Sequence, residues 1–106
     1  QARTDDMIVS AGYNIAGPEV ESAVMMHPAV AECGVIGVAD DERGQVVKAF
    51  VVLKPEHTGD AAMTAALQEF VKRTIAPYKY PRAVTYLAAL PRTETGKLQR
   101  FKLKDL

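Results

Sequence analysis

The sequence has 106 residues, and its 13 Lys and Arg are balanced by 13 Asp and Glu, so no excess charge favours nucleic acid or an acidic membrane as a partner. This length allows one domain, and a composition of 48% hydrophobic and 25% charged residues is typical of a globular protein rather than a disordered or collagen-like one. A single cysteine, Cys33, excludes an internal disulfide, and the sequence contains no run of 18 or more apolar residues. We therefore expect a reducing, cytoplasmic setting.

Although the net charge of the whole sequence is zero, its two parts carry opposite charges. Residues 1–71 carry a formal net charge of −7, whereas residues 72–106 carry +7. This division predicts a basic face that meets an anion, although a solvated basic face without a ligand is an equally good interpretation of charge alone.

The first third of the chain predicts a hairpin followed by a helix. Short apolar runs at 7–9 and 13–15 flank a turn in which Gly12 supplies a backbone angle that other residues resist. Pro18 suits the first helical position, and His27 next to a proline is expected to end the helix. The buried stripe of this helix is expected to contain Val20, Val24 and Met25.

The middle of the chain predicts two strands and a second helix. Runs 30–39 and 45–53 are rich in strand formers and are separated by a polar loop that ends in glycine. The second run is continuously apolar, which indicates a central strand covered on both faces. Asp60 lies within a segment that offers an N-cap, and apolar residues then recur at helical spacing for about fifteen residues until Pro77.

The last third predicts an extended segment, a strand and a short helix. Residues 78–82 are basic and aromatic and are expected to be extended, because Pro81 disfavours helical angles in the residue before it. Residues 83–90 resemble a third strand, and 98–106 a terminal helix. Together the elements predict an α+β layer structure in which helices cover a small sheet.

The polar loop that ends at Lys97 is a weak motif by itself. It has proline where a phosphate-binding loop needs glycine, and Leu98 replaces the Ser or Thr that holds magnesium. What remains is a lysine directly after a glycine, which could carry a point charge to a phosphate or carboxylate. A solvated loop lysine is the more common outcome for such a residue.

Four segments together resemble the small C-terminal domain of adenylate-forming enzymes, the superfamily of acyl- and aryl-CoA synthetases, peptide-synthetase adenylation domains and luciferases. They are residues 3–21 (beginning RTDDMIVSAGYNI), 28–37, 76–81 (APYKYP) and 91–100 (PRTETGKLQR), and they occur in the family's order. The resemblance implies a small antiparallel sheet with covering helices and an N-terminal β-hairpin. Residues 11–19 look most like aryl-acid CoA ligases of the benzoate and 2-aminobenzoate type.

The resemblance also implies a reaction. Such enzymes join a carboxylate to ATP, forming an acyl-adenylate and pyrophosphate, and then rotate the small domain so that CoA can attack the adenylate. Lys97 corresponds to the catalytic lysine of the first step, Arg3 to an arginine near the nucleotide, and Asp5 to the hinge residue. The remaining correspondences place Gly12 at the pantetheine channel and three residues at the nucleotide part of CoA, namely Tyr78, Lys79 and Arg82.

Residues 1–106 are therefore interpreted as the mobile C-terminal lid domain of an acid–CoA ligase that acts on an aromatic acid. The N-terminal domain, which is expected to hold the acid pocket and the Mg²⁺ that accompanies ATP, is absent, so the fragment alone is expected to be inactive. Two alternatives stay open: an adenylation domain that loads a carrier protein, or a non-catalytic binding module of the same fold. Asn14 stands where many relatives have an arginine near phosphate, and it carries no charge for such a contact.

Overall fold

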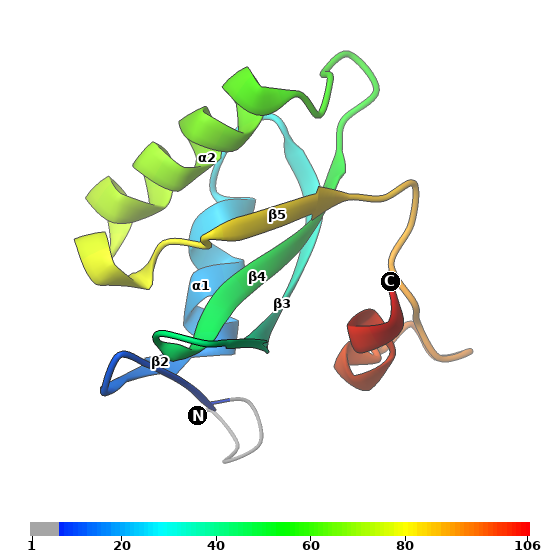
Figure 1. Ribbon diagram of the computed structural model, residues 1–106. Helices are drawn as coiled ribbons and strands as arrows, with labels where there is room; N and C mark the ends of the chain where they lie inside the picture. The colour runs from blue at the N-terminus through cyan, green and yellow to red at the C-terminus, as the bar shows by residue number, and fades with distance from the viewer. Residues whose placement is uncertain (1–6) are drawn as a thin grey trace.

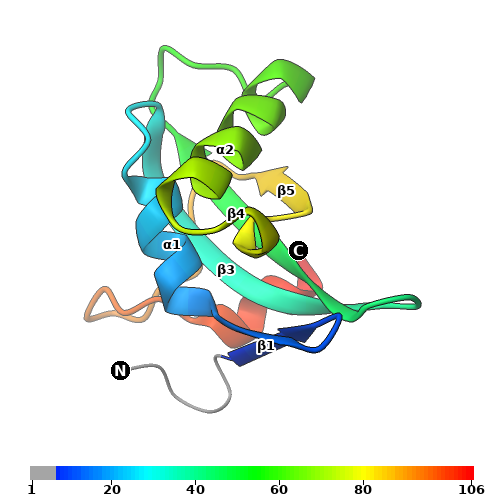
Figure 2. The same cartoon turned by 90° about the vertical axis from the view of Figure 1, so that its left-hand side faces the viewer.

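The computed structural model describes residues 7–106 and forms one layered α+β unit around a five-stranded sheet (Figure 1). Two α-helices cover one face of the sheet, and the C-terminal segment covers the other (Figure 2). The elements in chain order are β1 (Met7–Ser10), β2 (Tyr13–Ala16), α1 (Gly17–Met25), β3 (Val30–Asp40), β4 (Gly44–Leu53), α2 (Ala61–Thr74), the 3₁₀ turn η2 (Pro77–Lys79), β5 (Ala83–Tyr86) and the 3₁₀ helix η3 (Arg100–Asp105).

The sheet has the order β2-β1-β4-β3, and β5 also pairs with β4. β3 and β4 form the long central hairpin, whereas β1 meets β4 at the single pair Ser10 and Gly44. β5 runs parallel to β4, and α2 lies in the connection between them. The predicted small sheet with covering helices and an N-terminal hairpin is confirmed, with β5 as its one parallel strand.

The N-terminal hairpin turns through Ala11 and Gly12, which have φ angles of 50° and 85°. Both values lie in the left-handed region, where glycine is unstrained and alanine is not. The predicted use of Gly12 for a special backbone angle is therefore confirmed.

Strand β4 is buried on both faces, as its continuous apolar run predicts. Val47, Ala49 and Val51 belong to the core cluster beneath α1 and α2, whereas Phe50 points into a second cluster on the opposite face. Leu98 and Leu103 join Phe50 in that second cluster, so the C-terminal segment is held by apolar packing as well as by its polar contacts.

Both α-helices begin as predicted. Pro18 occupies the first turn of α1, and the Asp60 side chain caps α2 by accepting a 2.9 Å hydrogen bond from the Met63 amide. Val20 and Val24 are buried, but Met25 is 49% exposed, so its prediction as a core residue is wrong. Five residues of helix turn Met25 about 140° away from Val20, which places it off the buried stripe.

Three predictions for the last third need correction. Pro77–Lys79 form a 3₁₀ turn, and the extended backbone begins only at Tyr80, because the fixed φ of proline suits the start of a turn. The strand predicted for 83–90 ends at Tyr86, after which the chain crosses to the opposite face and buries Leu90 there. The terminal helix is the shorter 3₁₀ helix η3. Among the described residues, no helix has the length and apolar character needed to span a membrane.

Candidate functional site

Lys97 lies on a small hairpin loop whose backbone is fixed on each side of it. Arg92 and Leu98 form an antiparallel bridge, and Gly96 makes the turn with a φ of 88°. The Thr93 amide donates to the Lys97 carbonyl at 2.9 Å, and the Lys97 amide donates to the Thr93 hydroxyl at 3.0 Å. The Lys97 side chain is exposed, and within residues 7–106 its ammonium has neither a hydrogen-bond partner nor an ion-pair partner.

The upstream end of this loop is tied to β3 by an ion pair. Arg92 donates to one Glu32 carboxylate oxygen from Nε at 3.0 Å and from Nη2 at 2.6 Å. Its third nitrogen, Nη1, donates to the Gly96 carbonyl at 2.9 Å. One guanidinium therefore joins the central sheet to the residue that precedes Lys97.

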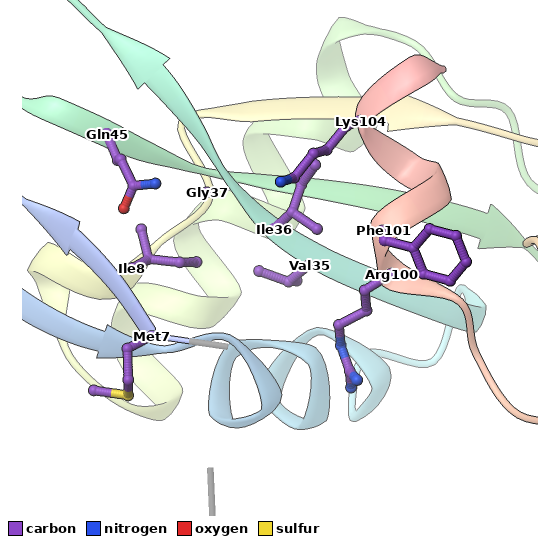
Figure 3. A pocket seen from close by; sticks show the side chains of 9 residues that line it. All are labelled: Met7, Ile8, Val35, Ile36, Gly37, Gln45, Arg100, Phe101 and Lys104. Atoms are coloured by element: carbon purple, nitrogen blue, oxygen red, sulfur yellow. The ribbon is translucent and has the colours of Figure 1, made fainter. Parts of the chain in front are cut away.

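The downstream end is tied to α1 by a more buried pair. Arg100 donates to both Glu21 oxygens at 2.6 Å, in the two-pronged geometry that a guanidinium and a carboxylate favour. Glu21 also accepts a 2.8 Å hydrogen bond from the Val35 amide of β3. Figure 3 shows the Arg100 side chain running from η3 toward α1, beside a cavity of about 200 Å³ whose other walls include Ile8, Ile36 and Lys104.

A second group of predicted site residues lies at the tip of the N-terminal hairpin. Tyr13, next to Gly12, stacks on Tyr78 with ring centroids 4.4 Å apart. A side chain at Gly12 would meet nothing within 4 Å, so the surface above the turn is open. The structure thus brings together Gly12 and Tyr78, which the resemblance places along CoA.

The two other predicted CoA residues differ in their charge environment. Lys79 forms a 2.8 Å ion pair with Glu19 of α1, and this hydrogen bond raises the pKa of the lysine above its usual value. Arg82 is exposed directly before β5, with its guanidinium carbon 4.9 Å from the centre of the Tyr80 ring. Within the described part of the chain, Arg82 has no acidic partner, so its charge is the more available of the two.

In Figure 1 the loop at 91–97 lies on the right, whereas the β1–β2 hairpin and the 3₁₀ turn η2 lie on the left. We use the name hairpin face for the surface formed by Gly12, Tyr13, Tyr78, Lys79 and Arg82.

Several other residues need separate mention. Arg3 and Asp5 lie outside the described residues, so their predicted nucleotide and hinge roles stay predictions. Residues 7–106 contain no group of three or more His, Cys, Asp or Glu side chains able to hold a metal ion. The assignment of Mg²⁺ to an N-terminal domain also stays a prediction. Cys33 is buried, and desolvation, followed by the nearby Glu21 charge, raises the pKa of its thiol, as expected for an inert core residue.

Comparison with known proteins places this arrangement in a family. Residues 19–97 match the AMP-binding enzyme C-terminal domain. The chain belongs to this family. It is 55% identical over 105 residues to the rat mitochondrial acyl-coenzyme A synthetase ACSM2, covering 96% of the chain and 18% of the rat protein.

Solved structures of two family members superpose closely on the domain. An acyl-CoA synthetase from Brucella canis is 45% identical with a TM-score of 0.91, and the match covers 96% of this chain and 19% of that one. The anthranilate CoA ligase AuaEII, bound to anthranoyl-AMP, is 43% identical with a TM-score of 0.87, over 97% of this chain and 20% of that one. The chain therefore spans about a fifth of the length of the relatives it matches.

Four site features were not predicted from the sequence. They are the partners of the cations, Glu19, Glu21 and Glu32, together with the ring of Tyr13. The opposite charges of the two parts of the chain carried the only signal for the ion pairs. Within residues 7–106, three of the cations after residue 71 pair with acids from the first third, so much of the expected basic face is neutralised within the domain.

Proposed function

We propose that this chain is the mobile C-terminal domain of an ATP-dependent acid–CoA ligase. In the first step, the substrate carboxylate attacks the α-phosphorus of ATP and releases pyrophosphate. In the second, the CoA thiol attacks the acyl carbon of the adenylate and releases AMP. Family membership and the domain's share of its relatives' length support this proposal, in which the remaining four-fifths of the enzyme supplies the acid pocket and most of the ATP site.

The observation that carries the proposal is the contrast between Lys97 and the arginines that flank it. Arg92 and Arg100 are both committed to carboxylates, while the Lys97 ammonium has no partner among residues 7–106 and lies beside a fixed turn. A cation on a fixed backbone, with no acidic partner among the described residues, is suited to stabilising the negative charge that develops between a carboxylate and the α-phosphate in the transition state. We assign Lys97 to adenylation.

The test is Lys97→Ala in the full-length ligase, with the two steps measured separately. ATP–pyrophosphate exchange should fall on the order of 100-fold to 1000-fold, the usual effect of removing one preorganised electrostatic group from a transition state. Thioester formation from preformed acyl-adenylate should stay within about twofold of the parent if Lys97 acts only in the first step. Lys102→Ala, at an exposed lysine of η3, is the matched control. Exchange at the parental rate in Lys97→Ala would refute the assignment.

We assign the hairpin face to the second step, with free CoA as the acceptor. Arg82 offers an available cation to CoA phosphate, and the ring of Tyr78 offers an aromatic surface to adenine. Arg82→Glu should raise the KM for CoA and leave pyrophosphate exchange unchanged. An unchanged KM for CoA would favour the alternative in which the acyl group passes to a carrier protein.

We further propose an aromatic acid, such as benzoate or 2-aminobenzoate, as the substrate. The likeness of residues 11–19 to aryl-acid ligases and the 43% identity to the anthranilate CoA ligase support this choice. The 55% identity to an acyl-coenzyme A synthetase supports an acyl-CoA ligase but does not specify the acid. A panel of aromatic and straight-chain acids in the pyrophosphate-exchange assay separates the two by their kcat/KM.

The roles of Arg3 beside the nucleotide and Asp5 at the hinge belong to the same proposal. Asp5→Pro would restrict the backbone rotation at this position and should slow thioester formation more than adenylation. A non-catalytic module of the same fold predicts no effect of any of these substitutions on either step.

A further inference from the structure

The peptide group that precedes Lys97 is held at both of its polar atoms. Arg92 Nη1 donates to the Gly96 carbonyl at 2.9 Å, and the Lys97 amide donates to the Thr93 hydroxyl at 3.0 Å. The Lys97 carbonyl in turn accepts from the Thr93 amide at 2.9 Å. The backbone of Lys97 is therefore fixed, and its side chain is the part left to move.

This arrangement is connected to the rigid centre of the domain through one residue. Glu32 lies on β3, which pairs with β4 over nearly its whole length. The Glu32 carboxylate accepts hydrogen bonds from two of the three Arg92 guanidinium nitrogens. The third nitrogen reaches Gly96, so a single planar guanidinium joins the sheet to the loop. A lysine at position 92 could bind Glu32 or the Gly96 carbonyl, but its compact ammonium lacks the fork geometry that holds both groups.

Apolar packing also holds the backbone on the downstream side of Lys97. Leu98 belongs to the apolar cluster around Phe50, and its Cδ2 lies 3.4 Å from the position that a Cβ on Gly34 would occupy. The residue after Lys97 is thus seated against β3, while the residue before it is held by Arg92.

We infer that Arg92, oriented by Glu32, is a positioning residue for adenylation that fixes the backbone from which Lys97 reaches its ligand. The inference rests on the proposed role of Lys97. Arg92 touches no reacting atom, and it acts only by setting where the lysine ammonium can go. Small errors in the placement of a reacting group cost large factors in rate, so loosening this contact should appear in the turnover of the first step.

The experiment uses the full-length ligase with Arg92→Met, Arg92→Lys and Glu32→Gln. In Arg92→Met, the kcat of adenylation should fall on the order of 10-fold to 100-fold, with the KM for ATP and acid changed little. The kcat of adenylation in Arg92→Lys and in Glu32→Gln should lie between the values of Arg92→Met and the parent, because each of these variants keeps part of the contact. Thioester formation from preformed adenylate should remain at the parental rate. Glu69→Gln, which breaks an exposed ion pair on α2, is the matched control and should leave both steps unchanged.

A second measurement separates positioning from general damage. If Arg92 acts through Lys97, adding Arg92→Met to Lys97→Ala should reduce adenylation no further. Equal slowing of both steps by Arg92→Met, or an additive loss in the double variant, would overturn the inference. Full adenylation by Arg92→Met, while Lys97→Ala is inactive, would also overturn it and leave the proposed function intact. Full adenylation by Lys97→Ala would instead overturn the proposed function.

Discussion

The Lys97 loop and the hairpin face are built in opposite ways. The loop is tied at both ends by arginine–carboxylate pairs, and among residues 7–106 the Lys97 ammonium at its turn has no partner. The hairpin face is held by stacked tyrosine rings, and one of its two cations, Lys79, is already paired with Glu19. The first region presents a charge from a fixed position, whereas the second presents an open aromatic surface.

Helix α1 connects these two regions through acids two residues apart. A separation of two residues turns a side chain by about 200° around a helix, so Glu19 and Glu21 point to nearly opposite sides. Glu19 is exposed and pairs with Lys79, whereas Glu21 is buried and pairs with Arg100. The contrast suggests that the loop depends on its ion pairs for stability more than the hairpin face does.

We expect the largest loss of unfolding free energy from Glu21→Ala. The substitution removes the carboxylate that accepts hydrogen bonds from Arg100 and from the Val35 amide. Breaking a buried pair costs about 3–5 kcal/mol, and the partial exposure of Arg100 reduces this to about 2–3 kcal/mol of unfolding free energy. Urea unfolding measures the loss. Glu69→Ala, at the exposed α2 pair, should cost less than about 0.5 kcal/mol. Equal losses in the two variants would remove the distinction between buried and exposed pairs.

A smaller effect is expected at the hairpin face from Tyr78→Ala. The change removes the stack on Tyr13, which is worth about 0.5–1.5 kcal/mol beyond the buried area. If the ring also supports CoA, the KM for CoA should rise about fivefold, equivalent to about 1 kcal/mol, with pyrophosphate exchange unchanged. Phe101→Ala, at an exposed ring on η3, is the control. A loss of pyrophosphate exchange in Tyr78→Ala would show that the two regions are not separate.

We expect the smallest effect on stability from the titration of His27, which follows the end of α1. The Ala29 amide donates a 3.1 Å hydrogen bond to His27 Nδ1, and burial, followed by the charge of His57, lowers the pKa of the ring below 6.5. The unfolded chain therefore takes up a proton before the folded one does. This contribution to stability is complete above pH 6.5 and declines as the pH falls toward the lowered value.

Thermal unfolding between pH 7.5 and pH 5 measures this contribution. In His27→Asn, the melting temperature should fall less over this range than in the parent, because the replaced side chain does not titrate. The same slope in both proteins would exclude His27 as a source of the pH dependence.

Much of the fold could be predicted because its signals are local. The apolar runs of β3 and β4, the Asp60 cap and the glycine turn each depend on residues close in sequence, and each was confirmed. The errors occurred where local signals are weak. A proline starts both turns and extended segments, so the 3₁₀ turn at Pro77 could not be distinguished from the extended backbone after it.

The site was predictable only in part, and for a related reason. Lys97 and Tyr78 were selected because short motifs contain them. Their supports could not be selected, because no local pattern states which acid Arg92 or Arg100 will meet. The choice of partner is made by the fold, through β3 and α1, and not by the spacing within a motif.

The ion pairs of both regions span most of the chain. Glu19 and Lys79, like Glu32 and Arg92, are 60 residues apart, and Glu21 and Arg100 are 79 apart. Neither region can therefore exist in a partly folded domain, because each requires the first and last thirds to have met. Contacts of such long separation form only when distant parts of the chain have come together, so folding of the whole domain and assembly of both surfaces should be one cooperative event.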